Sequence, residues 1–342
     1  SAVEVLRATL GATRVTGELA DRVGEKTGGN PFFIEELCHT LVEDGTIVVE
    51  AGEARLASAS DRLAIPDTVQ AVLKTRLDRL DPEAREILRS ASVIGREFGL
   101  ELLGRVVPSR SRLEAALEGL RAAGLIQRTT VIPEQTYRFK HALTLDVAYD
   151  SLLERQRRDR HKLVGESIEQ LYPDRLEEFA DRLATHFAGA EDWDRAVRYG
   201  FLAADRSAAV WRVAEAVGML GRIRPWLVHL EVDDDTRRRM LTRLLLEEER
   251  HLETLGRRER QQAVIDELLE ILPEEKSAEH AAVLVRQGEL STLIGAFERG
   301  LEAFREAIDV ANECGAVEEQ AMALRGVGHR YWRLGQYEEA LG

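Results

Sequence analysis

Two amphipathic segments near the start of the chain are joined by Thr27-Gly28-Gly29-Asn30-Pro31-Phe32-Phe33-Ile34-Glu35-Glu36-Leu37. The two glycines permit a turn with φ > 0, and the proline suits a first helical turn, where its missing N–H costs nothing. The stretch therefore predicts the end of one helix and the start of the next. On spacing alone, a plain corner between two helices is the favoured interpretation, so its meaning depends on the rest of the chain.

The chain around this corner, residues 1–60, reads as a helical unit. Short apolar faces indicate helices before the glycines, and the helix from Pro31 keeps an apolar stripe until Asp44-Gly45. The runs Thr46–Glu50 and Glu53–Ala57 then have the pattern of a small hairpin. We expect residues 1–60 to form a mainly helical unit with one hairpin.

Residues 61–160 predict a second unit with the order of a winged helix. Ile65-Pro66-Asp67 opens it, and three or four short helices follow, the last of them capped by Ser111. Two β-like runs then flank a turn at Pro133, and they are Leu125–Arg128 and Tyr137–Lys140. After His141 the pattern is helical, with one long helix or two in line between Asp146 and Tyr172.

Residues 161–342 predict helical hairpins that repeat about every forty positions. Five pairs separated by 40 positions carry this signal: Leu284 and Leu324, Gly288 and Gly328, Gly295 and Gly335, Phe297 and Tyr337, Gly300 and Ala340. The pattern resembles the tetratricopeptide repeat, in which small residues let two helices approach closely and aromatic side chains fill the groove. We expect a mainly α protein whose last part is a tetratricopeptide-like superhelix that binds a partner. The tryptophans at 193, 211, 226 and 332 are expected to fill the hairpins.

Composition and charge narrow the function classes. The 342 residues are 44% hydrophobic and 32% charged, and no apolar run is long enough to span a membrane. The two cysteines are far apart and indicate no disulfide framework, so we expect a cytoplasmic protein. The 47 Lys and Arg against 61 Asp and Glu give a net charge of −14, which argues against general polyanion binding. The histidines and the two cysteines have no metal or disulfide spacing, and we find no nucleophile motif.

The order of these landmarks resembles the STAND class of signal-transduction ATPases. The likeness is sharpest at Gly29-Asn30-Pro31 and at Phe139-x-His141-x-Leu143-x-x-Asp146. The resemblance implies that Gly29, Asn30 and Pro31 in a helical lid pack against bound ADP or ATP. It also implies that His141 reaches the phosphates and holds a closed form, for which an imidazole is chemically suited. Without the resemblance, a histidine satisfied by local backbone at a helix start is the favoured interpretation.

One departure from that class limits the expected activity. The sequence has no Gly-x-x-x-x-Gly-Lys-Ser/Thr loop to cradle phosphates. The ATPase core subdomain is expected before Ser1, and the last repeat stops after its first helix, so we expect part of a longer protein. This chain alone is not expected to hydrolyse ATP, and it would contact nucleotide only together with the core subdomain.

Two other functions stay open from the sequence. The repeats could serve as a protein-binding scaffold that ignores nucleotide. The winged unit could bind DNA through the helix that contains Arg112 and Arg121, but Glu114 and Glu118 on the same helix disfavour contact with phosphates. Nucleic acid is therefore the minority hypothesis, and the basic run Arg155–Lys162 is interpreted as a solvated helix face.

Overall fold

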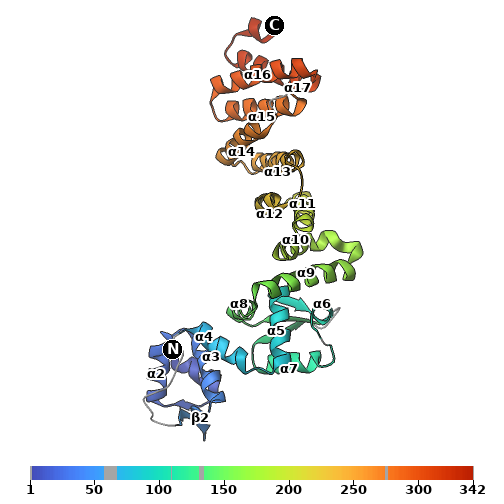
Figure 1. Ribbon diagram of the computed structural model, residues 1–342. Coiled ribbons are helices and arrows are strands. Elements are labelled where there is room, and N and C mark those ends of the chain that lie inside the picture. Colours follow the sequence, from blue (N-terminus) through green and yellow to red (C-terminus); the bar gives the residue numbers. More distant parts are fainter. Residues whose placement is uncertain (1, 58–67, 109, 131–134, 274–275, 342) are drawn as a thin grey trace. The chain divides into compact units, whose positions relative to one another are not determined.

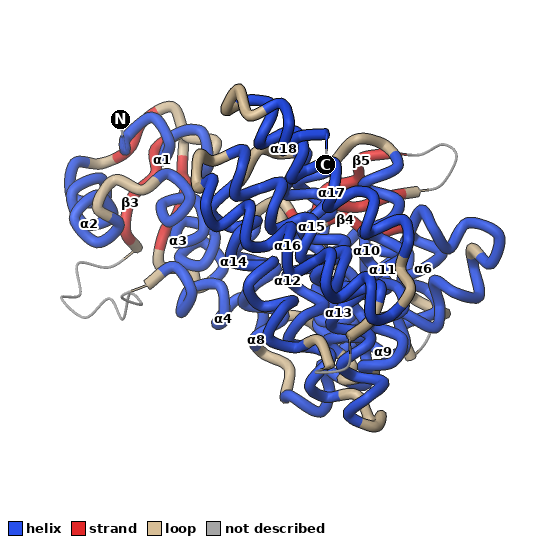
Figure 2. The backbone as a smooth tube through the Cα atoms, turned by 90° about the horizontal axis from the view of Figure 1, so that it is seen from above, coloured by secondary structure: helices blue, strands red, loops and turns tan. Residues whose placement is uncertain are grey.

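The computed structural model describes residues 2–57, 68–108, 110–130, 135–273 and 276–341. Helices dominate it, with two small sheets, which confirms the expected fold class (Figures 1 and 2). The chain divides into two compact units, Ser1–Leu171 and Tyr172–Gly342. The expected start of the winged unit at Ile65-Pro66-Asp67 and the turn at Pro133 lie outside the described residues.

The N-terminal part contains three helices and a small sheet. The helices are α1 (Ala2–Leu10), α2 (Gly17–Thr27) and α3 (Pro31–Glu43), and the strands are β1 (Arg14–Val15), β2 (Ile47–Glu50) and β3 (Glu53–Leu56). Strands β2 and β3 form the expected antiparallel hairpin, and β1, which the sequence did not predict, pairs parallel with β3. Ile34 and Leu37 on the apolar face of α3 are fully buried in the core of this part.

The winged-helix part follows the predicted order. It comprises α4 (Val69–Arg79), α5 (Pro82–Ile94), β4 (Glu97–Gly99), α6 (Leu100–Val106), α7 (Leu113–Ala122), β5 (Ile126–Thr130) and β6 (Thr136–Phe139). Strands β5 and β6 are the predicted wing, and β4 adds a third strand on the other edge of β6. The prediction that Ser111 caps this helix is wrong: the N-cap of α7 is Arg112, whose side chain makes no capping hydrogen bond.

Two helices follow the wing, which agrees with one of the two predicted arrangements, a single long helix or two in line. They are α8 (Ala142–Asp150) and α9 (Glu154–Leu171), so the first begins four residues before Asp146. The expected division at residues 160/161 falls inside α9, whereas the compact units separate at Leu171. The three-part division of the chain stays a prediction.

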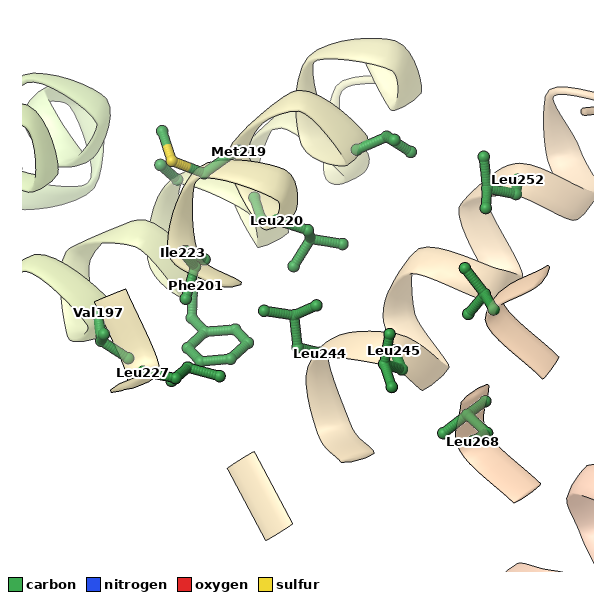
Figure 3. Packing of buried hydrophobic residues seen from close by; sticks show 14 of the residues in the cluster. Val197, Phe201, Met219, Leu220, Ile223, Leu227, Leu244, Leu245, Leu252 and Leu268 are labelled. Atoms are coloured by element: carbon green, nitrogen blue, oxygen red, sulfur yellow. The ribbon is translucent and has the colours of Figure 1, made fainter. Parts of the chain in front are cut away.

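The second unit consists of helices that pack on their neighbours in sequence. They are η1 (Pro173–Phe179), α10 (Ala180–Gly189), α11 (Trp193–Ala209), α12 (Val213–Trp226), η2 (Leu227–His229), α13 (Asp234–Thr254), α14 (Arg258–Ile271), α15 (Ala278–Leu293), α16 (Phe297–Cys314), α17 (Val317–Arg333) and α18 (Tyr337–Leu341). Stacking creates one apolar cluster from α10 to α15 and a second from α15 to α17. Figure 3 shows the Phe201 ring of the first cluster directed toward Leu227 and Leu244.

Glycines bring the last hairpins close together. A Cβ at Gly288 of α15 would lie 2.6 Å from the Phe304 ring of α16, and one at Gly326 of α17 would lie 2.5 Å from the same ring. The ring is thus held between two glycines, of which Gly288 belongs to the forty-residue pattern and Gly326 does not. The tryptophan expectation was partly wrong: Trp193 and Trp226 pack on the core, but the side chains of Trp211 and Trp332 are 85% and 60% exposed.

Candidate functional site

The corner before α3 has the geometry that its residues predict. Gly28 and Gly29 have φ of 58° and 76°, the left-handed region that favours glycine. Asn30 is the N-cap of α3, and its Oδ1 accepts from the backbone N–H groups of Phe32 at 3.1 Å and Phe33 at 3.4 Å. Residues 28–31 are exposed. Because Oδ1 already caps the helix, the Asn30 side chain has only its Nδ2 to offer a ligand.

His141 lies against the residue that follows this corner. It precedes α8 as the N-cap, and its ring centroid is 4.0 Å from that of Phe32. Its side chain makes no cap hydrogen bond, and its Nε2 is buried without a hydrogen-bond partner among the described residues. The imidazole is therefore not satisfied by the local backbone, the interpretation that spacing alone favours. Since Phe32 directly follows Pro31, the structure brings the corner and His141 into one neighbourhood.

The charge on His141 is set mainly by burial. Burial lowers the pKa of His141, the Lys140 ammonium lowers it further, and the Glu35 carboxylate opposes both. The His141 Nε2 lies 4.0 Å from Glu35 Oε2, while Lys140 forms an ion pair with the other oxygen of Glu35. The imidazole is thus neutral near pH 7, and it can offer one donor and one acceptor.

A polar face of α3 carries the contact with the winged-helix part. We define the polar face of α3 as Phe32, Glu35, Glu36 and His39, which recur at the spacing of one helical face. Glu36 forms an ion pair with Arg76 of α4, and the two side chains are only 3% and 4% exposed. Burial raises the pKa of Glu36, and the Arg76 guanidinium opposes that shift. Burial likewise lowers the pKa of His39.

Arg76 joins three elements at this place. Besides Glu36 of α3, its Nη2 donates to the carbonyl of Ala123, 2.8 Å away, at the end of α7. The sequence reasoning missed Arg76, Glu36, Glu35 and Lys140. Two adjacent glutamates opposite the apolar stripe of α3 were the available signal, but their partners lie 40 and 105 positions away. Charged contacts of α3 therefore connect the helix that follows the corner to the winged-helix part.

Three arginines on the surface of the winged-helix part are paired with carboxylates. Arg121 pairs with Glu118 at 2.7 Å, Arg138 with Glu97 at 2.8 Å, and Arg112 with Glu83 at 3.8 Å. Each carboxylate would have to be separated from its arginine, and would then repel phosphates nearby. This arrangement disfavours the DNA-binding hypothesis.

Two grooves in the second unit are large enough for a ligand or peptide. One of about 760 Å³ is lined by η1, α10, α11 and α12, with Val210 and Met219 among its apolar residues. The other, of about 610 Å³, is lined by α13, α14, α15 and α17, and includes Leu290 and the exposed Leu293. Both grooves combine apolar side chains with acidic and basic ones. No described helix is both long and apolar enough to cross a membrane.

Comparisons with known proteins give partial matches. Residues 1–55 match a family described as a domain of unknown function (DUF8739). A stretch of 155 residues is 30% identical to an uncharacterized protein of Rhizobium meliloti (strain 1021), covering 45% of this chain and 14% of that protein. The chain therefore spans about a seventh of the length of that curated relative.

Two solved structures are similar at low scores. The crystal structure of a STAND protein with a tetratricopeptide repeat sensor from Pyrococcus horikoshii has a TM-score of 0.38 and 13% identity, over 99% of this chain and 57% of that one. The crystal structure of BtubC from P. vanneervenii has a TM-score of 0.39 and 14% identity, over 54% of this chain and 75% of that one. At such low TM-scores, neither likeness bears on the function of this chain.

Proposed function

We propose that this chain is the regulatory part of a cytoplasmic nucleotide-dependent signalling ATPase. In this proposal, Gly29, Asn30, Pro31 and His141 form one wall of an ADP or ATP site, and the missing wall is a phosphate-binding core subdomain. The observation that carries it is the buried Nε2 of His141, which has no hydrogen-bond partner among the described residues and whose ring lies against Phe32 beside the exposed corner. A buried nitrogen without a partner is costly, and a phosphate oxygen would satisfy it.

The proposed mechanism is a two-state switch. A partner that binds the repeats favours a state in which the winged-helix part shifts and His141 leaves the nucleotide, which then exchanges. The charged contacts of the polar face of α3 suit such a movement, because water can solvate each charge after separation. The sequence has no Gly-x-x-x-x-Gly-Lys-Ser/Thr loop, so in this proposal the chain alone does not hydrolyse ATP.

The test is nucleotide retention by the full-length protein. Wild type and His141→Ala are purified in parallel, and bound ADP is quantified by chromatography after denaturation. We expect the variant to release ADP at least tenfold faster, since a lost hydrogen bond to a charged group costs about 1.5–3 kcal/mol. His329→Ala, in the second unit, is the control and should retain ADP normally. Equal retention by wild type and His141→Ala would contradict the sensor role.

A nucleotide-independent scaffold is the second candidate, and the two grooves of the second unit favour it. Calorimetry of the full-length protein with its partner, with and without ADP, separates the two functions. A partner affinity that changes with ADP supports the switch, because coupling between two sites is reciprocal. Equal affinities support the scaffold.

A further inference from the structure

A small cavity in the first unit lies between α4, α5 and α8. Its volume is about 250 Å³, below the usual range for drug-sized ligands. Its lining includes Ser151, which directly follows α8, whereas His141 precedes the same helix. The 9 residues of α8 separate these ends by roughly 13 Å at about 1.5 Å per residue. The cavity is therefore distinct from the corner beside His141.

Three cations line this cavity without forming ion pairs. Lys74 comes from α4, and Arg85 and Arg89 come from α5. In the part of the chain that the structure describes, none of the three has a carboxylate oxygen within 4.0 Å. By contrast, Arg76 and Arg79 of the same α4 both pair with carboxylates. In a chain with a net charge of −14, three such cations around one cavity indicate an attraction for an external anion.

The hydrogen bonds of the two arginines fix their positions. Arg85 donates from Nη2 to the backbone carbonyls of Asp78 and Leu80 at the end of α4, and its buried Nε has no hydrogen-bond partner among the described residues. Arg89 donates from Nε to Ser151 Oγ at 2.9 Å, and that hydroxyl donates to the carbonyl of Ala148. The anchored Nε orients the guanidinium of Arg89 and leaves its Nη groups for a ligand.

Two carboxylates in the lining, Asp78 and Asp150, oppose the three cations. Asp150 is paired with Arg157 at 3.2 Å, which offsets its charge. Three cations therefore line the cavity against two carboxylates, one of which is paired with an arginine outside the lining. An arginine whose Nε is already anchored, next to a lysine from another helix, suits the oxygens of a tetrahedral anion.

We propose that this cavity binds a phosphate-sized oxyanion between Lys74 and Arg89. The chemistry is shared by free phosphate and by a phosphoryl group on a larger molecule. The cavity admits only a small group, so the phosphoryl oxygens supply the recognition and any remainder of the ligand lies outside. This site is independent of the nucleotide contacts proposed for His141.

Titration calorimetry with sodium phosphate, against sodium chloride of equal ionic strength, tests the site. Equal ionic strength removes general screening, so only a specific site gives a saturable signal. We expect saturable binding to the wild-type chain, weakened about tenfold or more in Lys74→Ala. Two controls, Lys162→Ala at an exposed cation of α9 and His141→Ala, should bind as the wild type does.

Two results of the phosphate titration would contradict the oxyanion site. Phosphate that gives no more heat than chloride, or that binds Lys74→Ala and wild type equally, overturns the proposal. A parallel titration with O-phosphoserine shows whether the oxyanion is free phosphate or a phosphoryl group on a larger molecule. If O-phosphoserine binds more tightly than phosphate, the ligand of the cavity is a phosphoryl group on a larger molecule. If it binds more weakly, the ligand is the free anion. Either order supports an oxyanion site.

Discussion

The contact between α3 and the winged-helix part differs in kind from the contact around Phe304 in the repeats. The first depends on Glu36 and Arg76, a charged pair that folding removes from water. The second depends on an aromatic ring held between Gly288 and Gly326. A buried ion pair gains little over apolar packing, but each partner is costly when left alone. A close-packed ring instead tolerates no added atom. The first contact is therefore suited to a switch and the second to a fixed scaffold.

The largest effect is expected from removing one partner of the buried pair. Arg76→Ala leaves Glu36 buried without a counter-charge and should destabilise the contact by about 3–5 kcal/mol. Hydrogen exchange of peptides from α3 and α7, resolved by mass spectrometry, should show loss of protection there. The double variant Arg76→Ala with Glu36→Leu removes both charges and should recover most of that protection. Unchanged exchange in Arg76→Ala would mean that the ion pair does not hold the two parts together.

A smaller effect is expected when the pH is lowered around His161, a buried neutral histidine of the first unit. The free energy of unfolding should fall by about 3 kcal/mol. Burial lowers the pKa of His161 to about 4, and its Nε2 lies 3.0 Å from the hydroxyl of Tyr149. The unfolded histidine, with an ordinary pKa near 6.5, takes up a proton first as the pH falls. The contribution of neutral His161 to the free energy of unfolding is thus fully present above about pH 6.5 and is lost as the pH falls through about 4. His161→Gln should show a weaker loss between these values by urea unfolding.

Overpacking at Phe304 is expected to cost about 1–3 kcal/mol. In Gly288→Ala, the new methyl group meets the ring, and Gly326 on the other side limits where the ring can move. The measurement is exchange of amides in α15 and α17. Gly218→Ala in α12 is the matched control, because its Cβ would meet no atom within 4 Å. That variant should instead gain up to about 1 kcal/mol from helix propensity. Equal effects at the two glycines would refute the packing argument.

The smallest effect is expected at an exposed ion pair of the repeats. Arg222 and Asp181 lie 2.8 Å apart, but their side chains are 42% and 66% exposed. Arg222→Ala should change the stability of α10 and α12 by less than about 1 kcal/mol, since water already solvates both charges. A loss as large as that of Arg76→Ala would show that burial is not what separates the two kinds of contact.

The candidate site was predictable only where its chemistry is local. Two glycines, an asparagine and a proline fix the corner because each acts on its own backbone, and the structure has the expected turn and cap. The proximity of His141 to this corner came from a resemblance, not from spacing. Glu36 and Arg76 were missed because charged residues on amphipathic helices are usually exposed, and only a partner 40 positions away buries them.

The sequence by itself determined the helical character, the wing and the forty-residue recurrence of the last hairpins. Those features depend on periodicity and on turn residues, which act over a few positions. Tertiary structure alone decided the pairing of β1 with β3 and of β4 with β6, since strands of 2 and 3 residues carry no usable alternation. It also decided that one phenylalanine ring would lie between Gly288 and Gly326, and that one arginine would join α3, α4 and α7. Such contacts join residues far apart in sequence, and folding alone brings them together.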